Sequence, residues 1–222
     1  MSLKIAVFGD SNTWGFDPRT GLRQKARFVD LLRKDHPDWQ IIDDGLNGRL
    51  LDSQDPYFYD LSGSRQIERF TKQAAPYDLL VIALGANDAR RMFHRFLSSW
   101  TQSFERFAVG CKKANQQACR RFGRTAPILF VEPPAIPDGL RNNYEAIGSY
   151  GEDGIAILKT CGKIMQKVAK QEGFYVLEVQ NAELTGGMVD GIHLDQNGHA
   201  LMARLLGKKI EQLLQAALIQ PQ

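Results

Sequence analysis

The run Leu79-Leu80-Val81-Ile82-Ala83-Leu84 constrains the fold more than any other part of this chain of 222 residues. It is apolar at every position, whereas a strand with one face in water alternates, so we expect a strand covered on both faces. Longer stretches with helical spacing separate it from other short aliphatic runs at Lys4–Phe8, Gln40–Ile42, Ile128–Val131 and Phe174–Val179. Strands that alternate with helices predict an α/β protein, a three-layer α/β/α sandwich around a parallel sheet of about five strands.

The organisation of the chain favours one domain over residues 1–222. The sequence shows no internal repeat and no Pro/Ser-rich linker. The last helix is expected to begin after Asp195, a good N-cap residue. The stretch Pro133–Gly154 carries three prolines and four glycines, so we expect a long surface excursion after the fourth strand. Long loops at the carboxyl edge of such sheets commonly shape a binding site.

Composition excludes several classes of function. The 28 Lys and Arg residues nearly balance 25 Asp and Glu, and the one dense basic stretch, Arg120–Arg124, is short, which disfavours a nucleic-acid partner. No apolar run approaches the ~20 residues of a membrane span, and the N-terminal run is too short for a signal peptide. Three cysteines, Cys111, Cys119 and Cys161, lack metal-type spacing. We therefore expect a reduced, cytoplasmic protein without a metal site.

The segment Phe8-Gly9-Asp10-Ser11-Asn12-Thr13-Trp14-Gly15 follows the first expected strand directly. Ser11 would therefore emerge at the carboxyl end of the sheet, with its backbone N–H near a helix start. Both features suit a nucleophile whose attack creates an oxyanion. Gly, Asp, Ser and Asn are also ordinary turn residues, so this segment alone leaves a plain strand-ending turn open.

A second segment, Asp190-Gly191-Ile192-His193-Leu194, lies between the last expected strand and the last helix. A nucleophilic serine needs a general base, and the base needs a carboxylate that fixes its tautomer. A bend at Gly191 could bring Asp190 to one nitrogen of His193 and leave the other facing Ser11. A lone Asp-x-x-His is weak evidence, but both segments fall on the same edge of one sheet.

Two further strand exits carry candidate hydrogen-bond donors. Asn87, in Leu84-Gly85-Ala86-Asn87-Asp88, follows the most apolar strand, and its amide could donate to a developing negative charge. Gly48, in Asp43-Asp44-Gly45-Leu46-Asn47-Gly48-Arg49, could present a backbone N–H without a side chain in the way. Each segment by itself also fits a simple turn.

Taken together and in this order, the four segments resemble the SGNH hydrolase superfamily, also called GDSL esterases. The resemblance spans Ile5 to about Leu206. It implies the flavodoxin-like fold of that superfamily and assigns Ser11 as nucleophile, His193 as base and Asp190 as its orienting acid. It also implies an oxyanion hole formed by the N–H of Ser11, the N–H of Gly48 and the side chain of Asn87.

Within the superfamily, the first segment and Asp-Gly-Ile-His-Leu look like the arylesterase and acyltransferase branch. That likeness implies a serine esterase for short-chain acyl or aryl esters, with an acyl-enzyme intermediate, transfer to alcohols as a further activity, and no cofactor. It also implies self-association into a homo-oligomer, with a small-molecule ester as the other partner. Two departures, Asn12 for leucine and Ala86 for threonine, leave the nucleophile and the donor in place.

The substrate pocket is expected around Asp10, Asn12 and Trp14, which flank the nucleophile. Other loop aromatics, Phe16, Phe58 and Tyr59, are candidates for an apolar wall, although such residues often only cover a core edge. The segment Asp52–Ser64, which holds Phe58 and Tyr59, is expected either to pack over the site or to mediate self-association.

Other functions compete with this interpretation. A carbohydrate O-acetyl esterase would use the same site, and a non-catalytic binding module could share the fold. Metal-dependent hydrolysis through Asp190, His193 and His199 is disfavoured because His199 falls in the last expected helix and no third strong ligand lies nearby in the sequence. A nucleotide or flavin binder is disfavoured because the phosphate-cradling glycine patterns are missing.

Overall fold

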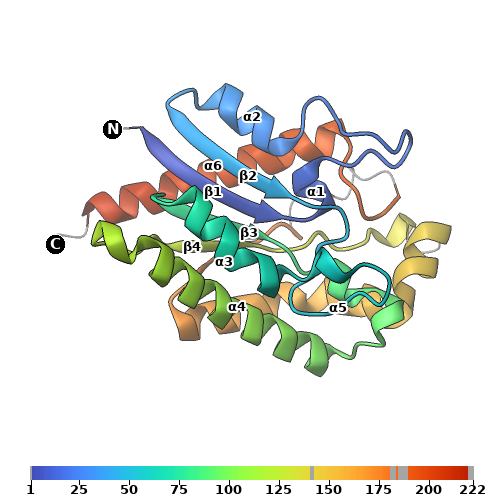
Figure 1. Ribbon diagram of the computed structural model, residues 1–222. Coiled ribbons are helices and arrows are strands. Elements are labelled where there is room, and N and C mark those ends of the chain that lie inside the picture. The colour runs from blue at the N-terminus through green and yellow to red at the C-terminus, as the bar shows by residue number, and fades with distance from the viewer. Residues whose placement is uncertain (1, 141–142, 181–183, 185–189, 220–222) are drawn as a thin grey trace.

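The computed structural model describes residues 2–140, 143–180, 184 and 190–219. Within them, five parallel strands form one sheet in the order β2-β1-β3-β4-β5 (Figure 1). The strands are β1 (Leu3–Gly9), β2 (Trp39–Gly45), β3 (Leu79–Ala83), β4 (Ile128–Val131) and β5 (Tyr175–Leu177). The predicted parallel sheet is confirmed, with β2 longer and β5 shorter than the sequence runs indicated.

Helices cover both faces of the sheet, so the fold is the predicted three-layer sandwich (Figure 1). One face packs against α2 (Phe28–Asp35) and α6 (Gln196–Ile219). The other face packs against α3 (Gly63–Ala74), α4 (Leu97–Cys119) and α5 (Tyr144–Glu172). A short helix, α1 (Ser11–Trp14), follows β1, and 3₁₀ turns η1 (Tyr59–Leu61), η2 (Asn87–Ala89), η3 (Arg91–Phe93), η4 (Arg120–Phe122) and η5 (Asp138–Leu140) lie in the connections.

The pleat of the sheet explains why its central strands read as unbroken apolar runs. Along β1, Ile5 and Val7 contact the core under α2 and α6, whereas Ala6 and Phe8 contact the core under α3, α4 and α5. All four are at most 1% exposed. A parallel strand with helices on both faces has no solvent side, so alternation is lost.

The prediction of a long surface excursion over Pro133–Gly154 is wrong from Tyr144 onward, and residues 141 and 142 lie outside the described part. Helix α5 already begins at Tyr144 and passes through a break at Gly151, where φ is +63°. Gly154 permits close packing of α5 on η2, because a Cβ there would lie 2.2 Å from the carbonyl oxygen of Ala89. This glycine therefore serves helix packing, and Tyr150, buried one turn earlier, anchors the segment.

None of the described helices combines the length and the apolar composition that a membrane span requires.

Candidate active site

The first strand delivers Ser11 to the carboxyl edge of the sheet through a tightly packed turn. Gly9 ends β1, and a Cβ there would lie 2.0 Å from Oγ1 of Thr13, so the turn needs glycine. Asp10 caps α1, since its Oδ1 accepts a hydrogen bond of 3.0 Å from the N–H of Asn12. Gly15 ends the helix with a left-handed backbone conformation, and its N–H donates a hydrogen bond of 2.8 Å to the carbonyl of Ser11. These contacts fix Ser11 as the first residue of α1.

Ser11, His193 and Asp190 form a continuous hydrogen-bonded line. Oγ of Ser11 lies 3.1 Å from Nε2 of His193, and Nδ1 of His193 lies 2.8 Å from Oδ2 of Asp190. The other oxygen, Oδ1 of Asp190, accepts the backbone N–H groups of Ile192 at 2.9 Å and His193 at 2.8 Å. Gly191, with φ at +85°, provides the bend that closes this turn. The three side chains thus meet as the sequence predicts.

The charge state of Asp190 follows from these contacts. Burial works to raise the pKa of this carboxyl, but the hydrogen bond and charge of His193 and the two backbone N–H groups hold its pKa below the ordinary value. An ionised Asp190 accepts a hydrogen bond from the Nδ1–H of His193. The lone pair of Nε2 therefore faces the hydroxyl of Ser11, which is the tautomer that a general base requires.

Asn12 joins the loop of the histidine to the helix of the serine. Its Nδ2 donates to the carbonyl of Ile192 at 3.2 Å, and its Oδ1 accepts the N–H of Leu194 at 2.9 Å. The sequence analysis placed Asn12 in the pocket, but the structure uses both ends of its amide to hold the His193 loop on α1. A leucine at this position could make neither bond.

Asn87 and Gly48 also lie at this edge, and they are connected to each other. Asn87 begins η2, directly after β3, and its Nδ2 donates to the carbonyl of Arg49 at 3.1 Å. Gly48, next to Arg49, has φ at +78°, which favours glycine. Both residues line the same cavity as Ser11. The exits of β2 and β3 therefore place two donor-bearing residues beside the serine.

Asp88, which the sequence analysis left without a role, strengthens the connection between these exits. It is fully buried, and its carboxylate accepts the N–H of Leu51 and the hydroxyl of Ser53, both at 2.7 Å. Burial raises the pKa of Asp88 to about 6, although both hydrogen bonds favour the ionised form. The position of Asp88 directly after Asn87 could have predicted this role, because a carboxylate there can accept hydrogen bonds from a neighbouring loop.

Two buried groups of opposite charge, Asp10 and Arg49, lie near Ser11. Burial raises the pKa of Asp10 to about 6, while the N–H of Asn12 and the charges of His193 and Arg49 oppose that rise. Arg49 is 1% exposed, donates to the carbonyl of Gly9 and to Oδ1 of Asp44 at 2.8 Å each, and lies over the ring of Phe8. Arg49 thus fixes the end of β1 to the end of β2.

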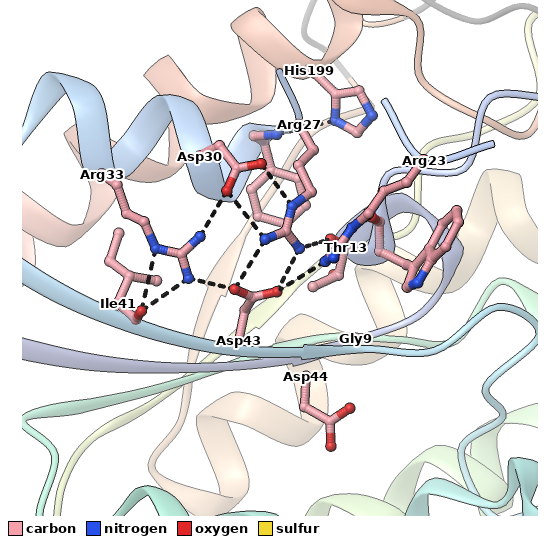
Figure 2. A network of polar contacts seen from close by, with 12 residues as sticks. Gly9, Thr13, Arg23, Arg27, Asp30, Arg33, Ile41, Asp43, Asp44 and His199 are labelled. Atoms are coloured by element: carbon pink, nitrogen blue, oxygen red, sulfur yellow. Dashed lines mark hydrogen bonds and ion pairs between the residues drawn. The ribbon is translucent and has the colours of Figure 1, made fainter. Parts of the chain in front are cut away.

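A second network, which the sequence analysis missed, holds α1 from the opposite side (Figure 2). Arg27 donates to the carbonyl of Thr13 at 3.0 Å, and its guanidinium also binds the carboxylates of Asp30 and Asp43. Asp43 is shared with Arg33. These partners come from α1, α2 and β2, so the network joins three elements around the nucleophile helix.

The cavity at this edge has a volume of about 250 Å³. Its walls are formed by Ser11, Phe16, Asn47, Gly48, Asn87, Arg90, Ser149, Tyr150, Asp190, Ile192 and His193. The ring of Phe16 lies 4.9 Å from that of His193, so this loop aromatic does reach the site.

The other predicted pocket residues lie elsewhere. Asp10 and Asn12 line a separate, small cavity of about 30 Å³, and Trp14 lies under the guanidinium of Arg23. Phe58 and Tyr59 are 65% and 72% exposed, and among the described residues none from Asp52–Ser64 lines the catalytic cavity. The pocket prediction therefore does not match the cavity walls here, while self-association through this exposed segment stays a prediction.

His199 lies in α6, as the sequence analysis expected. Its Nδ1 accepts the N–H of Phe28 at 3.3 Å, and burial lowers the pKa of the imidazole to about 4. Among the described residues no three His, Cys, Asp or Glu side chains gather as a metal site would require.

A family model of acylhydrolases that matches most of the chain places it in the class of carboxylic ester hydrolases. More closely, the chain belongs to the GDSL-like lipase/acylhydrolase family, whose model matches residues 7–201. This agrees with the resemblance to SGNH hydrolases. No curated protein matched the sequence.

Solved structures share this fold at low sequence identity. The carbohydrate acetylesterase Est24 from Sinorhizobium meliloti is 22% identical with a TM-score of 0.77, over 95% of this chain and 99% of that one. The aryl esterase of M. smegmatis is 21% identical with a TM-score of 0.77 over the same shares. A lipase/acylhydrolase from Enterococcus faecalis is 21% identical with a TM-score of 0.67, over 95% and 96% of the chains. At such identities the likeness establishes the fold.

Proposed function

We propose that the protein is a serine esterase that hydrolyses carboxylic esters with short acyl or aryl groups through a Ser11–His193–Asp190 triad. The observation that carries this proposal is the alignment of the three side chains, at 3.1 Å and 2.8 Å, on the wall of an open cavity. Both separations lie within the range in which a base can accept the proton of a nucleophile.

In the first half of the reaction, Oγ of Ser11 attacks the ester carbonyl carbon as Nε2 of His193 takes its proton. The imidazolium that forms is stabilised by the Asp190 carboxylate at Nδ1. His193 then gives the proton to the oxygen of the leaving alcohol, and the acyl group stays on Ser11 as an ester.

The developing oxyanion is stabilised by the N–H of Ser11, the N–H of Gly48 and Nδ2 of Asn87. An amide NH₂ has two donors. In Asn87 one of them binds the carbonyl of Arg49 and fixes the plane of the amide, so the second has a set direction. Donors fixed in advance need no rearrangement as charge appears, and they therefore stabilise the transition state strongly.

In the second half, His193 activates a water molecule that attacks the acyl-enzyme and releases the acid. An alcohol that enters instead gives acyl transfer. The cavity volume of about 250 Å³ lies just below the usual range for ligand pockets, roughly 300–1,000 Å³, which supports a preference for small esters.

The proposal is tested by intact mass after treatment with a fluorophosphonate, with peptide mapping and Ser11→Ala as control. We expect a single adduct on Ser11 in the wild type and none in the variant. A folded wild-type protein that takes up no label would contradict the triad and favour a non-catalytic binding module.

A second candidate substrate class is acetylated carbohydrate, because the structurally similar Est24 is described as a carbohydrate acetylesterase. The same triad would serve, and only the alcohol would differ. Acetate release from acetylated xylose, compared with that from 4-nitrophenyl acetate, distinguishes the two. A higher kcat/KM for the sugar ester would favour this second candidate.

A further inference from the structure

A second and larger cavity, of about 440 Å³, adjoins the catalytic one. It lies between the segment that follows β3 and the N-terminal part of α5. Arg90 and Tyr150 line both cavities. A substrate whose ester lies at Ser11 would therefore meet these two side chains before it reached the outer space.

Arg90 lies three residues after Asn87, the proposed oxyanion donor. Its N–H donates to the carbonyl of Asn87 at 3.1 Å, which closes η2, so Arg90 lies one 3₁₀ turn from the proposed oxyanion donor. Its side chain is only half-buried, and among the described residues no carboxylate lies within ion-pair distance of its guanidinium. By contrast, Arg95 in the same outer cavity binds Ser53 at 2.6 Å and approaches Asp52.

Tyr150 adds a neutral donor beside Arg90. Its side chain is 2% exposed and lines both cavities. Burial raises the pKa of Tyr150 well above the ordinary value, although the charge of Arg90 opposes this, so the phenol keeps its proton.

The balance of charge around the cavities selects the ligand. In the wall of the catalytic cavity, the carboxylate of Asp190 is taken up by hydrogen bonds from His193 and two backbone N–H groups, whereas the guanidinium of Arg90 has no carboxylate partner among the described residues. Glu152 and Asp153 are exposed, and they line the outer cavity but not the catalytic one. A half-buried guanidinium without a partner is stabilised by an anion, and its planar fork matches a carboxylate. One positive charge balances a monoanion better than a dianionic phosphate.

We propose that Arg90, with the hydroxyl of Tyr150 beside it, binds a carboxylate of the substrate, so that the ester carries a free carboxylate in its acyl or its alcohol part. This inference rests on the proposed function and narrows its substrate class. Arg90 would determine specificity, and the chemistry would remain with Ser11, His193 and Asp190.

Two matched pairs of esters test the proposal. Mono-4-nitrophenyl adipate and its methyl ester differ by a carboxylate in the acyl part. Similarly, 4-acetoxybenzoate and its methyl ester differ by a carboxylate in the alcohol part. For each pair, the ratio of kcat/KM between the anionic and the neutral ester is measured in the wild type and in Arg90→Gln. Dividing one ratio by the other cancels the intrinsic reactivity of the esters.

We expect the anionic preference to fall about 10- to 100-fold in Arg90→Gln for at least one pair, as for the loss of a charge-assisted hydrogen bond. The pair that responds identifies which part of the ester carries the carboxylate. Arg90→Lys should keep part of the preference, because it keeps the charge and loses the fork. Arg91→Gln, the exposed neighbour that lines only the outer cavity, should change the ratio less than about twofold in 0.15 M salt.

Equal ratios in wild type and Arg90→Gln for both pairs would overturn the proposal. An equal loss in Arg91→Gln would also overturn it, because it would reveal a diffuse field instead of a site. If the proposed esterase function itself were wrong, the protein would not turn over the neutral esters and the fluorophosphonate would not label Ser11. Calorimetry with Ser11→Ala then still measures binding of each pair, and equal Kd values for anionic and neutral members would reject the carboxylate site.

Discussion

At the scale of single residues, Asn87 offers a direct test of electrostatic stabilisation. Its amide is oriented by one bond to the carbonyl of Arg49, and its other N–H is proposed to face the oxyanion. We expect Asn87→Ala to lower kcat by about 100- to 1,000-fold, the usual effect of losing one such donor. Steady-state kinetics with 4-nitrophenyl acetate, with a thermal melt to verify folding, provides the measurement. Turnover near that of the wild type would remove Asn87 from the oxyanion hole.

Asp190 allows the orienting role to be separated from the reacting one. In Asp190→Asn, the side-chain oxygen can still accept the N–H groups of Ile192 and His193, while the NH₂ faces Nδ1 of His193. The imidazole then carries its proton on Nε2 and cannot act as a base. We expect kcat to fall about 10⁴-fold, less than the ~10⁶-fold for Ser11→Ala. Equal losses in burst-corrected kinetics would show that Asp190 does more than orient the base.

At the scale of elements, the position of α1 depends on Arg27. Arg27 and Asp43 have side chains only 7% and 9% exposed, and Arg27 also supports the carbonyl of Thr13. Breaking a buried pair costs about 3–5 kcal/mol, because it leaves a charge without its partner. We therefore expect Arg27→Met to lower the free energy of unfolding, measured in urea, by about 3 kcal/mol. This is the lower end of the range, because Asp43 keeps Arg33 as a partner in the variant.

Arg33→Met is the matched control, since it removes another guanidinium from the same Asp43. Its side chain is 34% exposed, so solvent screens the pair, and we expect a loss below about 1 kcal/mol. If both variants lost a similar free energy of unfolding, the burial of Arg27 would add nothing to its contribution, and the prediction would be wrong.

The strands could be predicted from the sequence because each has a purely local cause. Central parallel strands such as β3 are apolar throughout, because helices cover both of their faces. The start of α5 could not be predicted from the sequence, because its glycines are typical of residues that interrupt a helix. Their role becomes clear only from the segment that packs against them. Gly154 is explained by the carbonyl of Ala89, which lies 65 residues away in sequence on η2.

The same distinction holds within the candidate site. Ser11 and Asn87 could be located because they follow strands that the sequence reveals, and His193 because it lies in the connection just before the last predicted helix. The pairing of Arg27 with Asp43 and the approach of Tyr150 to the cavity arise only from tertiary packing. Asn12 was read as a pocket residue because of its neighbour Ser11, whereas its partners are 180 and 182 residues further on.

At the scale of the whole molecule, His199 connects the pH of the medium to stability. It is fully buried where α6 packs against α2, and its Nδ1 accepts the N–H of Phe28. Burial lowers its pKa from 6.5 to about 4. As the pH falls from 7 to 4, the histidine of the unfolded chain takes up a proton before that of the folded chain, so the fold is destabilised. At 1.36 kcal/mol per pKa unit, the loss is about 3 kcal/mol.

Asp10 and Asp88 act in the opposite direction over part of this range, because burial raises each pKa to about 6 and the folded state then holds protons that the unfolded chain has released. The measurement is therefore a difference between the wild type and His199→Asn, whose Oδ1 can still accept the N–H of Phe28. We expect the free energy of unfolding of the wild type, relative to the variant, to fall by about 3 kcal/mol between pH 7 and pH 4. Parallel stability curves for the two proteins would show that His199 is protonated in the folded state as readily as in the unfolded one, and that α6 does not seal it from water.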